Sequence, residues 1–403
     1  MVIRKVVFII VLIVVFSFVG SFVFSQDVMW DLPSFFSTPR QLSYGDARLL
    51  YPYDPFLFLV NPSILSYTRV GAFYLTKLSF YAGANLGYLY NTLNLASYNL
   101  NPTEWIGFDW NILTNDLLRD PYGILLNTEP EVGLMGPLAV GYVGNGIGIL
   151  LYNDFFSSLD IIQTPGIPIV SLKSFAEVGI TLGFSTYFDI SKFYTLHLGI
   201  SLSYSKRYKS PFFYGASALE IVNYYEKTKE GVYEYDVGDS FWGNVGLILD
   251  DGNFLKYSLN VENFFGRTFY WNRVILTNGQ EVSKGYNYLS YIPPVVSLGA
   301  MFHLEKIPYI PTFLFSDFMV EVNLIDVFNF SEFWFKKVKV GAEISLLKIF
   351  KARGGINQGY ITFGAGVDTK IVVIDISISQ YEKSPLPGYK GAQNLSVSLE
   401  LKF

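Results

Sequence analysis

The sequence predicts an all-β protein, an up-and-down antiparallel transmembrane β-barrel of about 14 strands with an N-terminal hatch segment. Three observations lead to this prediction. Many segments alternate strictly between apolar and polar residues, as an extended strand with two different faces does; residues 394–403, NLSVSLELKF, are the clearest case. Long and short connections alternate along the chain, as the outer loops and periplasmic turns of such a barrel do. The chain also begins with the residue order of a secretory signal peptide.

Composition supports a membrane protein over a soluble enzyme. Charged residues make up 16% of the chain and aromatic residues 18%, against about 25% charged in an average soluble domain. The chain contains no cysteine, which excludes a disulfide framework and a thiolate metal site. Acidic residues outnumber basic residues by 34 to 29, which disfavours nucleic acid or an anionic lipid surface as a partner.

The N-terminus predicts export to the outer membrane of a bacterial cell. Arg4 and Lys5 precede an apolar run from Val6 to Phe24, and Ser25-Gln26 follow. This order predicts a signal peptide over residues 1–25. The alternative is an uncleaved anchor, because about 19 apolar residues can just cross a bilayer. Later stretches are too short or too polar for a spanning helix.

Residues 26–79 precede the regular alternation and are predicted to form a hatch, or plug, inside the barrel. Prolines and glycines break this stretch too often for one long helix or strand, as in 51–56, YPYDPF. It still carries many apolar side chains, so it must pack against other parts of the protein. We expect short helical turns here, and we group the strand-like stretch Val70–Lys77 with this segment.

Residues 80–403 are predicted to form the barrel. The expected strands are 80–91, 134–143, 146–156, 175–189, 194–208, 239–249, 254–264, 294–304, 313–326, 337–346, 349–356, 360–368, 371–381 and 393–403. The segment 134–143 is the least regular of these, because Pro137 interrupts it.

The connections sort by length. The long ones are 92–133, 157–174, 209–238 and 265–293, and tight turns such as Gly144-Asn145 and 190–193 lie between them. A soluble Greek-key sandwich gives no reason for such sorting. Aromatic residues also gather at predicted strand ends, for example Tyr187 and Phe188, which is typical of the girdles of a membrane barrel and also of ordinary core packing.

One segment resembles a known family. Residues 43–48, SYGDAR, followed by Asp54 and by 61–65, NPSIL, resemble the N-terminal signature of the long-chain fatty acid transporter (FadL-like) barrels, to which the type IX secretion shuttle barrels are related. The resemblance implies a fourteen-stranded barrel with an internal hatch. It also implies a hatch or ligand motif, at Gly45, Asp54, Asn61, Pro62 and Ser63. Ser63-Ile64 departs from the family's Ala-Gly, which favours a shared fold over a shared substrate.

A purely structural role for this motif is the alternative, with Asn61 capping a turn and Pro62 fixing it. Five further polar residues are expected to face the lumen: His197, Glu262, His303, Glu321 and Glu343. No nucleophile or metal-ligand motif accompanies the two histidines. The sequence therefore predicts no catalytic residues, no metal site and no cofactor.

Two pairs of acidic residues could bind calcium, although such pairs are more often solvated charges in loops. These pairs are Glu129 with Glu131 and Asp250 with Asp251.

Three functions fit this reading, all with the lipid bilayer of an outer membrane as the first partner. The first is passage of hydrophobic or amphipathic small molecules along an apolar groove past the hatch and out sideways. The second is a structural envelope barrel whose outer loops 209–238 and 265–293 bind envelope or secreted proteins. The third is a general diffusion porin, which the mixed charges expected in a plugged lumen disfavour.

Overall fold

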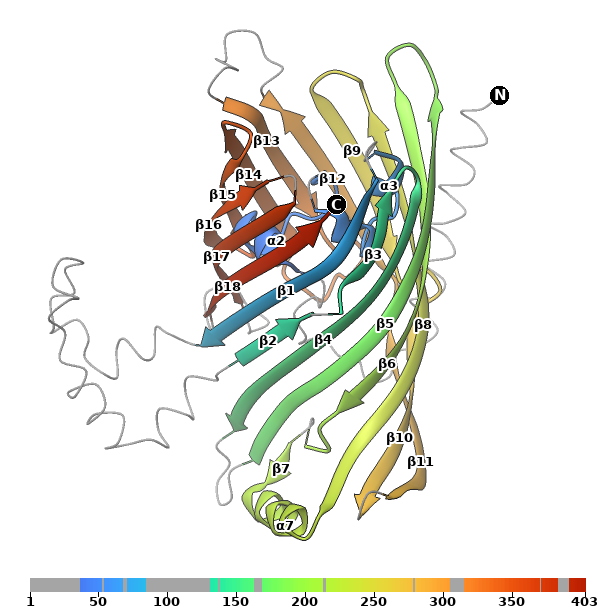
Figure 1. The fold of residues 1–403 in the computed structure, drawn as a ribbon, viewed down its shortest axis with the longest axis vertical. Coiled ribbons are helices and arrows are strands. Elements are labelled where there is room, and N and C mark those ends of the chain that lie inside the picture. The colour runs from blue at the N-terminus through green and yellow to red at the C-terminus, as the bar shows by residue number, and fades with distance from the viewer. Residues whose placement is uncertain are drawn as a thin grey trace, which may run out of the picture.

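The strands of the chain form one antiparallel sheet that closes on itself (Figure 1). The computed structural model describes residues 37–52, 54–67, 71–84, 131–136, 138–162, 169–212, 215–277, 280–304, 315–369, 371–382 and 391–403. The predicted signal peptide and most of the predicted first outer loop lie outside these residues. No helix in the described part of the chain is long and apolar enough to cross a membrane.

Helical elements are few and short. They are α2 (Pro39–Ser43), the 3-10 helix η1 (Pro55–Leu59), α3 (Ile64–Tyr67), α7 (Ala218–Lys229) and α8 (Trp334–Lys337). The strands are β1 (Ala72–Ala84), β2 (Glu131–Met135), β3 (Val140–Gly144), β4 (Ile147–Ile162), β5 (Ile169–Asp189), β6 (Thr195–Lys209), β7 (Ala216–Ser217), β8 (Val232–Asp250), β9 (Leu255–Glu262), β10 (Arg267–Thr277), β11 (Gln280–Ile292), β12 (Val295–His303), β13 (Phe315–Leu324), β14 (Val338–Leu346), β15 (Phe350–Asn357), β16 (Tyr360–Asp368), β17 (Val372–Glu382) and β18 (Gly391–Lys402).

Within the described residues these segments occupy fourteen positions around a closed barrel. Three positions are shared by two successive segments each. β2 and β3 share the position between β1 and β4. β9 and β10 share the next position beside β8. β11 and β12 share the position after that, where β11 pairs with β10 and β12 pairs with β9. β7 pairs with β5 beyond the end of β6. β1 also pairs with β18, which closes the sheet. The predicted fold class is confirmed.

The two faces of the wall have the burial expected of a barrel in lipid. On β18 the apolar Leu395, Val397 and Leu399 are 51%, 42% and 41% exposed, whereas Ser396 and Ser398 are 1% and 3% exposed. A soluble sandwich would bury the apolar face. Here the apolar side chains point outward and the polar ones inward, so the outer surface suits acyl chains and the interior is polar.

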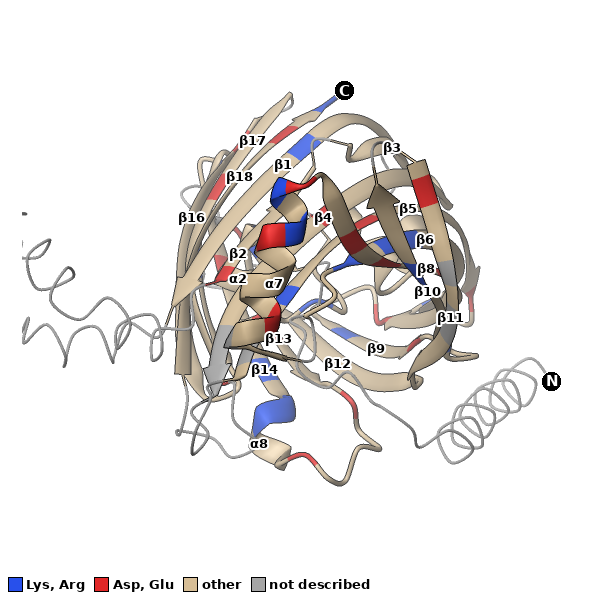
Figure 2. Cartoon of the chain, turned by 90° about the horizontal axis from the view of Figure 1, so that it is seen from below, with Lys and Arg blue, Asp and Glu red and all other residues tan. Residues whose placement is uncertain are grey.

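One side of the barrel is much taller than the other. β5 has 21 residues and β8 has 19, whereas β14 and β16 have nine each. β4, β5, β6, β8, β10 and β11 extend toward the end that carries α7 (Figures 1 and 2). The predicted loop 209–238 is shorter than expected, because β8 begins at Val232, and it holds β7 and α7. The predicted loop 265–293 is wrong, because β10 and β11 fill most of that range.

Outward residues of these strand extensions explain why the sequence pattern predicted loops there. Lys206, Asp239 and Asn272 occupy positions that are apolar lower on the wall. These polar residues interrupt the apolar outward pattern on which a strand prediction depends, although exposed apolar residues such as Tyr233 and Leu289 continue it nearby.

The boundary between hatch and barrel also differs from the prediction. β1 begins at Ala72, so residues 72–79 belong to the barrel wall and not to the hatch. The register of β1 against β18 shifts between Tyr74 and Thr76. Such a bulge interrupts the alternation at the point where the strand would otherwise be recognised. β1 ends at Ala84, and the rest of the expected strand 80–91 lies outside the described residues.

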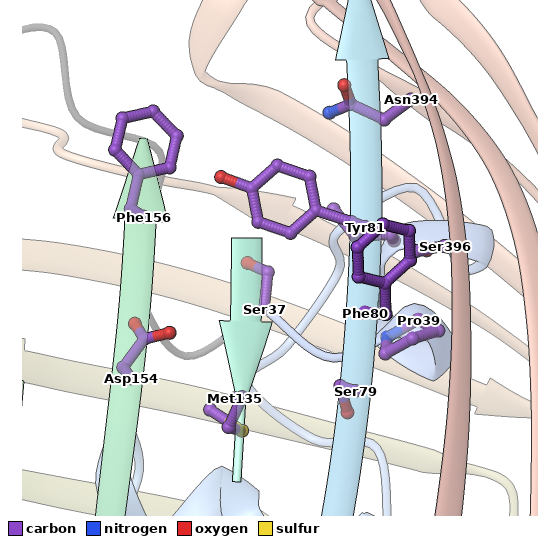
Figure 3. Close-up of a pocket in the computed structure, with 11 residues that line it drawn as sticks. Ser37, Pro39, Ser79, Phe80, Tyr81, Met135, Asp154, Phe156, Asn394 and Ser396 are labelled. Atoms are coloured by element: carbon purple, nitrogen blue, oxygen red, sulfur yellow. The ribbon is translucent and has the colours of Figure 1, made fainter. Parts of the chain in front are cut away.

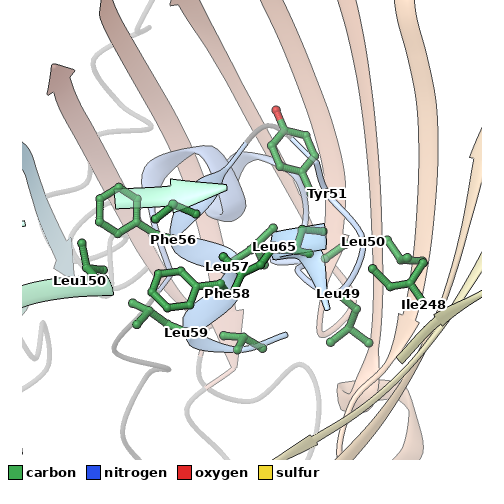
Figure 4. Packing of buried hydrophobic residues seen from close by; sticks show 14 of the residues in the cluster. Leu49, Leu50, Tyr51, Phe56, Leu57, Phe58, Leu59, Leu65, Leu150 and Ile248 are labelled. Atoms are coloured by element: carbon green, nitrogen blue, oxygen red, sulfur yellow. The ribbon is translucent and has the colours of Figure 1, made fainter. Parts of the chain in front are cut away.

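The described residues of the hatch, 37–52 and 54–67, lie inside the barrel and supply most of its hydrophobic core (Figure 4). Leu49, Phe58 and Leu65 are fully buried, and they pack with inward-facing wall residues such as Leu150 and Ile248. The short helical turns expected here are α2, η1 and α3. The apolar side chains of this segment are thus buried against the inner surface of the wall.

Two glycines of the wall make room for the hatch. A Cβ atom at Gly199 on β6 would overlap the backbone of Pro62 and Ser63, and one at Gly246 on β8 would overlap the Asn61 side chain. The turn 61–63 therefore lies directly on the backbone of two strands. Side chains at these two positions would push it away.

We predict that Gly199→Ala and Gly246→Ala each lower the free energy of unfolding by about 1–3 kcal/mol, the usual cost of inserting an extra methyl group into a packed contact. The control is Gly354→Ala, where the nearest atom to an added Cβ is 3.8 Å away. Heat-modifiable gel migration of the purified barrel measures the effect. Equal unfolding temperatures for all three variants would contradict this account of the docking.

Candidate functional site

Asp54 is the centre of the hatch. Its side chain is fully buried and accepts hydrogen bonds from the Thr38 hydroxyl (2.6 Å), the Gln41 amide (3.1 Å) and the backbone N–H of Phe56 (3.1 Å). Lys77 on β1 lies 3.4 Å away and pairs with Asp54 and with Glu400 of β18. One carboxylate thereby joins α2, η1 and the strand pair that closes the barrel.

A chain of buried charges ties α2 to the opposite wall. Arg40 pairs with Asp375 on β17 at 3.0 Å, Asp375 pairs with Arg353 on β15 at 2.6 Å, and Arg353 pairs with Glu343 on β14 at 2.5 Å. The Tyr51 hydroxyl donates a hydrogen bond to Glu343. All five side chains are nearly inaccessible to solvent. The predicted lumen residue Glu343 therefore holds the hatch.

Two further acids fix the middle of the hatch. Glu321 on β13, another of the predicted residues, is fully buried and accepts hydrogen bonds from the backbone N–H groups of Leu49 (3.0 Å) and Leu50 (2.9 Å). On the hatch itself, Asp46 pairs with Lys339 of β14 at 2.6 Å. These contacts anchor residues 46–50 to the short side of the wall.

The motif residues serve the internal structure of the hatch. The amide of Asn61 donates to the Leu49 carbonyl (2.6 Å) and to Ser258 of β9 (3.1 Å), and its oxygen accepts from the hydroxyl of Ser63 (2.5 Å). Gly45 has φ +66° and donates its N–H to Thr362 of β16. A Cβ there would overlap the Val340 carbonyl. These contacts match the structural alternative for the motif.

The remaining predicted lumen residues are spread along the wall. The Nδ1 atom of His197 is 3.0 Å from the Ser66 hydroxyl at the end of α3. Glu262 lies 3.8 Å from Arg48 of the hatch. His303 is buried at the end of β12. The structure does not bring the two histidines and the three glutamates together into one site.

The acid pairs have other partners. Glu131 is buried on β2 and accepts a hydrogen bond from Tyr381, while Glu129 lies outside the described residues. Asp250 and Asp251 accept backbone N–H groups of the turn between β8 and β9, at 2.8 Å in each case. The described residues contain no group of three or more acids or histidines placed to hold a metal ion.

A cavity of about 50 Å³, here called the inner pocket, lies between α2 and the wall (Figure 3). Residues of the hatch, β1, β2, β4 and β18 border it. They are Ser37, Pro39, Leu42, Ser79, Phe80, Tyr81, Met135, Asp154, Phe156, Asn394 and Ser396. Apolar side chains form most of its surface, with a few polar groups among them, which is the usual character of a small-molecule site.

A second cavity of about 210 Å³, the outer pocket, adjoins it at the mouth of the barrel. Its lining comes from the hatch, the 325–337 connection and the outer ends of the short strands: Ser37, Leu42, Asp46, Arg48, Ile325, Glu332, Lys336, Lys337, Lys339, Asn357, Gln358, Tyr381 and Asn394. Ser37, Leu42 and Asn394 border both cavities. A polar compartment at the mouth thus leads to a more apolar one below it.

The wall beside the inner pocket is interrupted. The ladder between β1 and β2 ends at the pair Ser79 and Met135, and it resumes between β1 and β3 at Tyr74 and Gly141. Asn153 of β4 bridges the gap. Its side chain accepts the N–H of Leu138 (2.8 Å) and donates to the carbonyl of Gly136 (2.9 Å). The Asn153 amide thus replaces ladder hydrogen bonds between this segment and β4, while the regular pairing with β1 is interrupted between Ser79 and Tyr74.

Sequence reasoning pointed to this interruption only through Pro137, and it missed the pocket. The residues that border the pocket come from 37–42, 79–81, 135, 154–156 and 394–396. Closure of the barrel between β1 and β18 brings them together. The sequence feature that could have indicated the pocket is a polar residue at an inward position among apolar neighbours, such as Asp154.

Comparison with known proteins gives structural matches alone. No protein-family description and no curated protein matches the chain. Among solved structures, it is similar to the toluene transporter TodX of Pseudomonas putida, with 10% identity over 93% of this chain and 99% of that chain and a TM-score of 0.41. The toluene transporter TbuX of Ralstonia pickettii matches with 10% identity over 91% and 98% and a TM-score of 0.43. A Pseudomonas aeruginosa homologue of FadL matches with 9% identity over 93% and 99% and a TM-score of 0.42.

The charge environment of Asp54 predicts loosening of the hatch in acid. Burial alone would raise the pKa of the Asp54 carboxyl, but Lys77 and Arg40 outweigh burial and hold the pKa below its ordinary value. The same holds for Asp46, where Lys339 and Arg48 outweigh burial. A lowered folded-state pKa contributes stability above the ordinary carboxyl pKa, and this stability is lost as the pH falls through the lowered value.

We therefore expect backbone amides of residues 37–67 to lose hydrogen-exchange protection at about pH 3 relative to neutral pH, ahead of the strands of the wall. Mass spectrometry of the exchanged, detergent-solubilised protein measures this. Asp54→Asn should already be less protected near neutral pH and should respond less to acid. Unchanged protection of the hatch at acid pH would contradict the argument.

Proposed function

We propose that the protein is an outer-membrane β-barrel that passes hydrophobic or amphipathic small molecules from the cell exterior toward the bilayer. The route enters the outer pocket, passes Leu42 and Asn394 into the inner pocket, and leaves sideways at the gap between β2 and β3. The observation that carries the proposal is that two pockets with three lining residues in common lie beside an interruption of the strand pairing. Export by residues 1–25 is part of the proposal.

The outer surface supports a place in a membrane. The apolar outward residues of β18 have counterparts on β4 and β5, where Ile149, Ile180 and Leu182 are 47%, 42% and 54% exposed. Aromatic side chains mark the edge of this belt at the turn between β5 and β6, where Tyr187 and Phe193 are exposed. Amphipathic rings favour the boundary between lipid and water.

The interior supports a sideways exit over a straight axial one. The hatch fills the lumen, and its anchors reach β13, β14, β15 and β17 as well as β1. Breaking one partner of a single buried pair costs about 3–5 kcal/mol, so displacing the whole hatch is far costlier than moving one leucine. Such a filled lumen also argues against a general diffusion porin.

The alternative of a partner-binding envelope barrel retains one feature in its favour. α7, at the rim of the tall wall, exposes Leu219, Val222 and Tyr225 along one face. The other region suggested for docking, 265–293, is largely strand. Passage of small molecules accounts for the pockets and the gap together, and docking accounts for neither.

Leu42→Trp should close the route, because Leu42 borders both pockets and an indole exceeds the space it leaves. We expect cells that carry this variant in their outer membrane to take up the hydrophobic fluorescent probe N-phenyl-1-naphthylamine at the rate of cells without the protein. The unmodified protein should raise that rate. The matched control is Leu219→Trp on the exposed face of α7, which should behave as the unmodified protein. Equal uptake with and without the protein would refute the proposed passage.

A further inference from the structure

The inner pocket has an unusual charge balance for a site that receives amphipathic molecules. Of the described residues that border it, Asp154 is the only charged one, and none is basic. Asp154 is 8% exposed and has no ion-pair partner among the residues that the structure describes. The nearest buried cations on the wall, Arg207 and Arg267, are both paired with Glu177. A carboxylate without a counter-ion therefore faces a largely apolar cavity.

Three polar atoms of the same pocket have no hydrogen-bond partner among the described residues. They are the hydroxyl of Ser79, the hydroxyl of Tyr81 and the side-chain oxygen of Asn394. Ser79 and Asn394 are 7% and 5% exposed, so water is largely excluded from them. Figure 3 shows the Tyr81 hydroxyl extending from β1 toward β4, the strand that carries Asp154. Buried polar atoms without partners are uncommon and call for an explanation.

The types of these atoms define the complementary ligand. The Asn394 oxygen only accepts hydrogen bonds, as does Asp154 in its ionised form, and the two hydroxyls can accept as well as donate. A ligand that satisfies them must donate. A ligand carboxylate would instead meet Asp154 with a charge of the same sign and no cation to offset it, in surroundings where charges are poorly screened.

The apolar part of the pocket sets the shape of the ligand. Pro39, Leu42, Met135 and Phe156 form its apolar sides. Its volume of about 50 Å³ is well below the roughly 150 Å³ of a cavity that accepts benzene. The enclosed space therefore holds the head group and the first carbons of a slim alkyl chain, and the rest of the chain extends out of it.

Resting on the proposed function, we propose that the inner pocket selects alkyl compounds with a hydrogen-bond-donating head group, primary amines above alcohols, and excludes carboxylates. Asp154 receives the head group, and Ser79, Tyr81 and Asn394 supply the remaining acceptors. A protonated amine satisfies the acceptors and supplies the missing positive charge. An alcohol supplies one donor and no charge.

The test is isothermal titration calorimetry of the full chain in a non-ionic detergent near neutral pH, with hexylamine, 1-hexanol and hexanoate. The three compounds share one chain length and differ in the head group. Leu42→Trp, in which the pocket is filled, supplies the baseline for partitioning into micelles. We expect hexylamine to bind roughly tenfold or more tightly than 1-hexanol, as hydrogen bonds to charged groups are the stronger kind, and hexanoate to give only the baseline.

Two variants assign the effect to the pocket. Asp154→Asn should bring hexylamine to the affinity of 1-hexanol, and Glu226→Gln, which removes the same charge from the exposed face of α7, should change nothing. Tyr81→Phe, which removes only a hydroxyl, should weaken 1-hexanol and hexylamine several-fold. If heat-modifiable gel migration shows that Asp154→Asn does not fold into a barrel, Tyr81→Phe still tests the inference.

The outcomes separate this inference from the proposed function. Hexanoate binding as tightly as hexylamine, or a preference for amine that survives Asp154→Asn, would overturn the ligand class while leaving passage in place. Saturable binding of all three compounds with equal affinity would do the same. Failure of the uptake experiment with N-phenyl-1-naphthylamine would overturn passage itself, whatever the order of affinities.

Discussion

The structure depends on the requirement that every backbone amide at membrane depth find a partner inside the protein. A sheet meets this requirement only by closing, and here β1 and β18 complete the closure over a continuous ladder from Leu78 with Leu399 to Ala84 with Gln393. Once the outward face has been given to apolar residues, the inward face must be polar. The interior is then a narrow space rich in carboxylates and cations, and an internal segment can fill it only by presenting opposite charges and backbone donors. Arg40, Asp46 and Asp54 do this from the hatch.

This requirement also explains why the gap in the wall is informative. The described residues between β2 and β3 leave the ladder, and an unsatisfied amide in lipid would cost several kcal/mol. Asn153 supplies both a donor and an acceptor to the interrupted segment. A gap whose hydrogen bonds are provided by a side chain is compatible with a stable barrel. The outward Leu138, which is 45% exposed, continues the apolar outer surface across the interruption.

Alternation made most of the wall predictable, and its failures have identifiable causes. In 394–403 the two faces differ so strongly that direction and burial follow from the residues alone. In β1 a bulge between Tyr74 and Thr76 moved the apparent boundary of the hatch, and on the tall strands the outward Asp239 and Asn272 interrupt the apolar pattern that marks a strand. The hatch motif could be placed inside the barrel, but not its contacts. Which wall residue meets Asp54 or Leu42 depends on closure and register, which pair residues more than 300 positions apart, as with Arg40 and Asp375.

The distribution of the anchors limits how the lumen can open. Ion pairs and backbone hydrogen bonds hold the hatch against β13 to β17, and the turn 61–63 is seated on the glycines of β6 and β8. The inner pocket occupies the remaining side, between α2 and β1, β2 and β4. Releasing the hatch as a body would leave Asp375, Glu343 and Glu321 without their hatch partners all at once. Rotation of Leu42 and Asn394 would join the two pockets without breaking any of those contacts. The arrangement of charges thus favours a small side-chain movement at one edge of a fixed hatch over its withdrawal from the barrel.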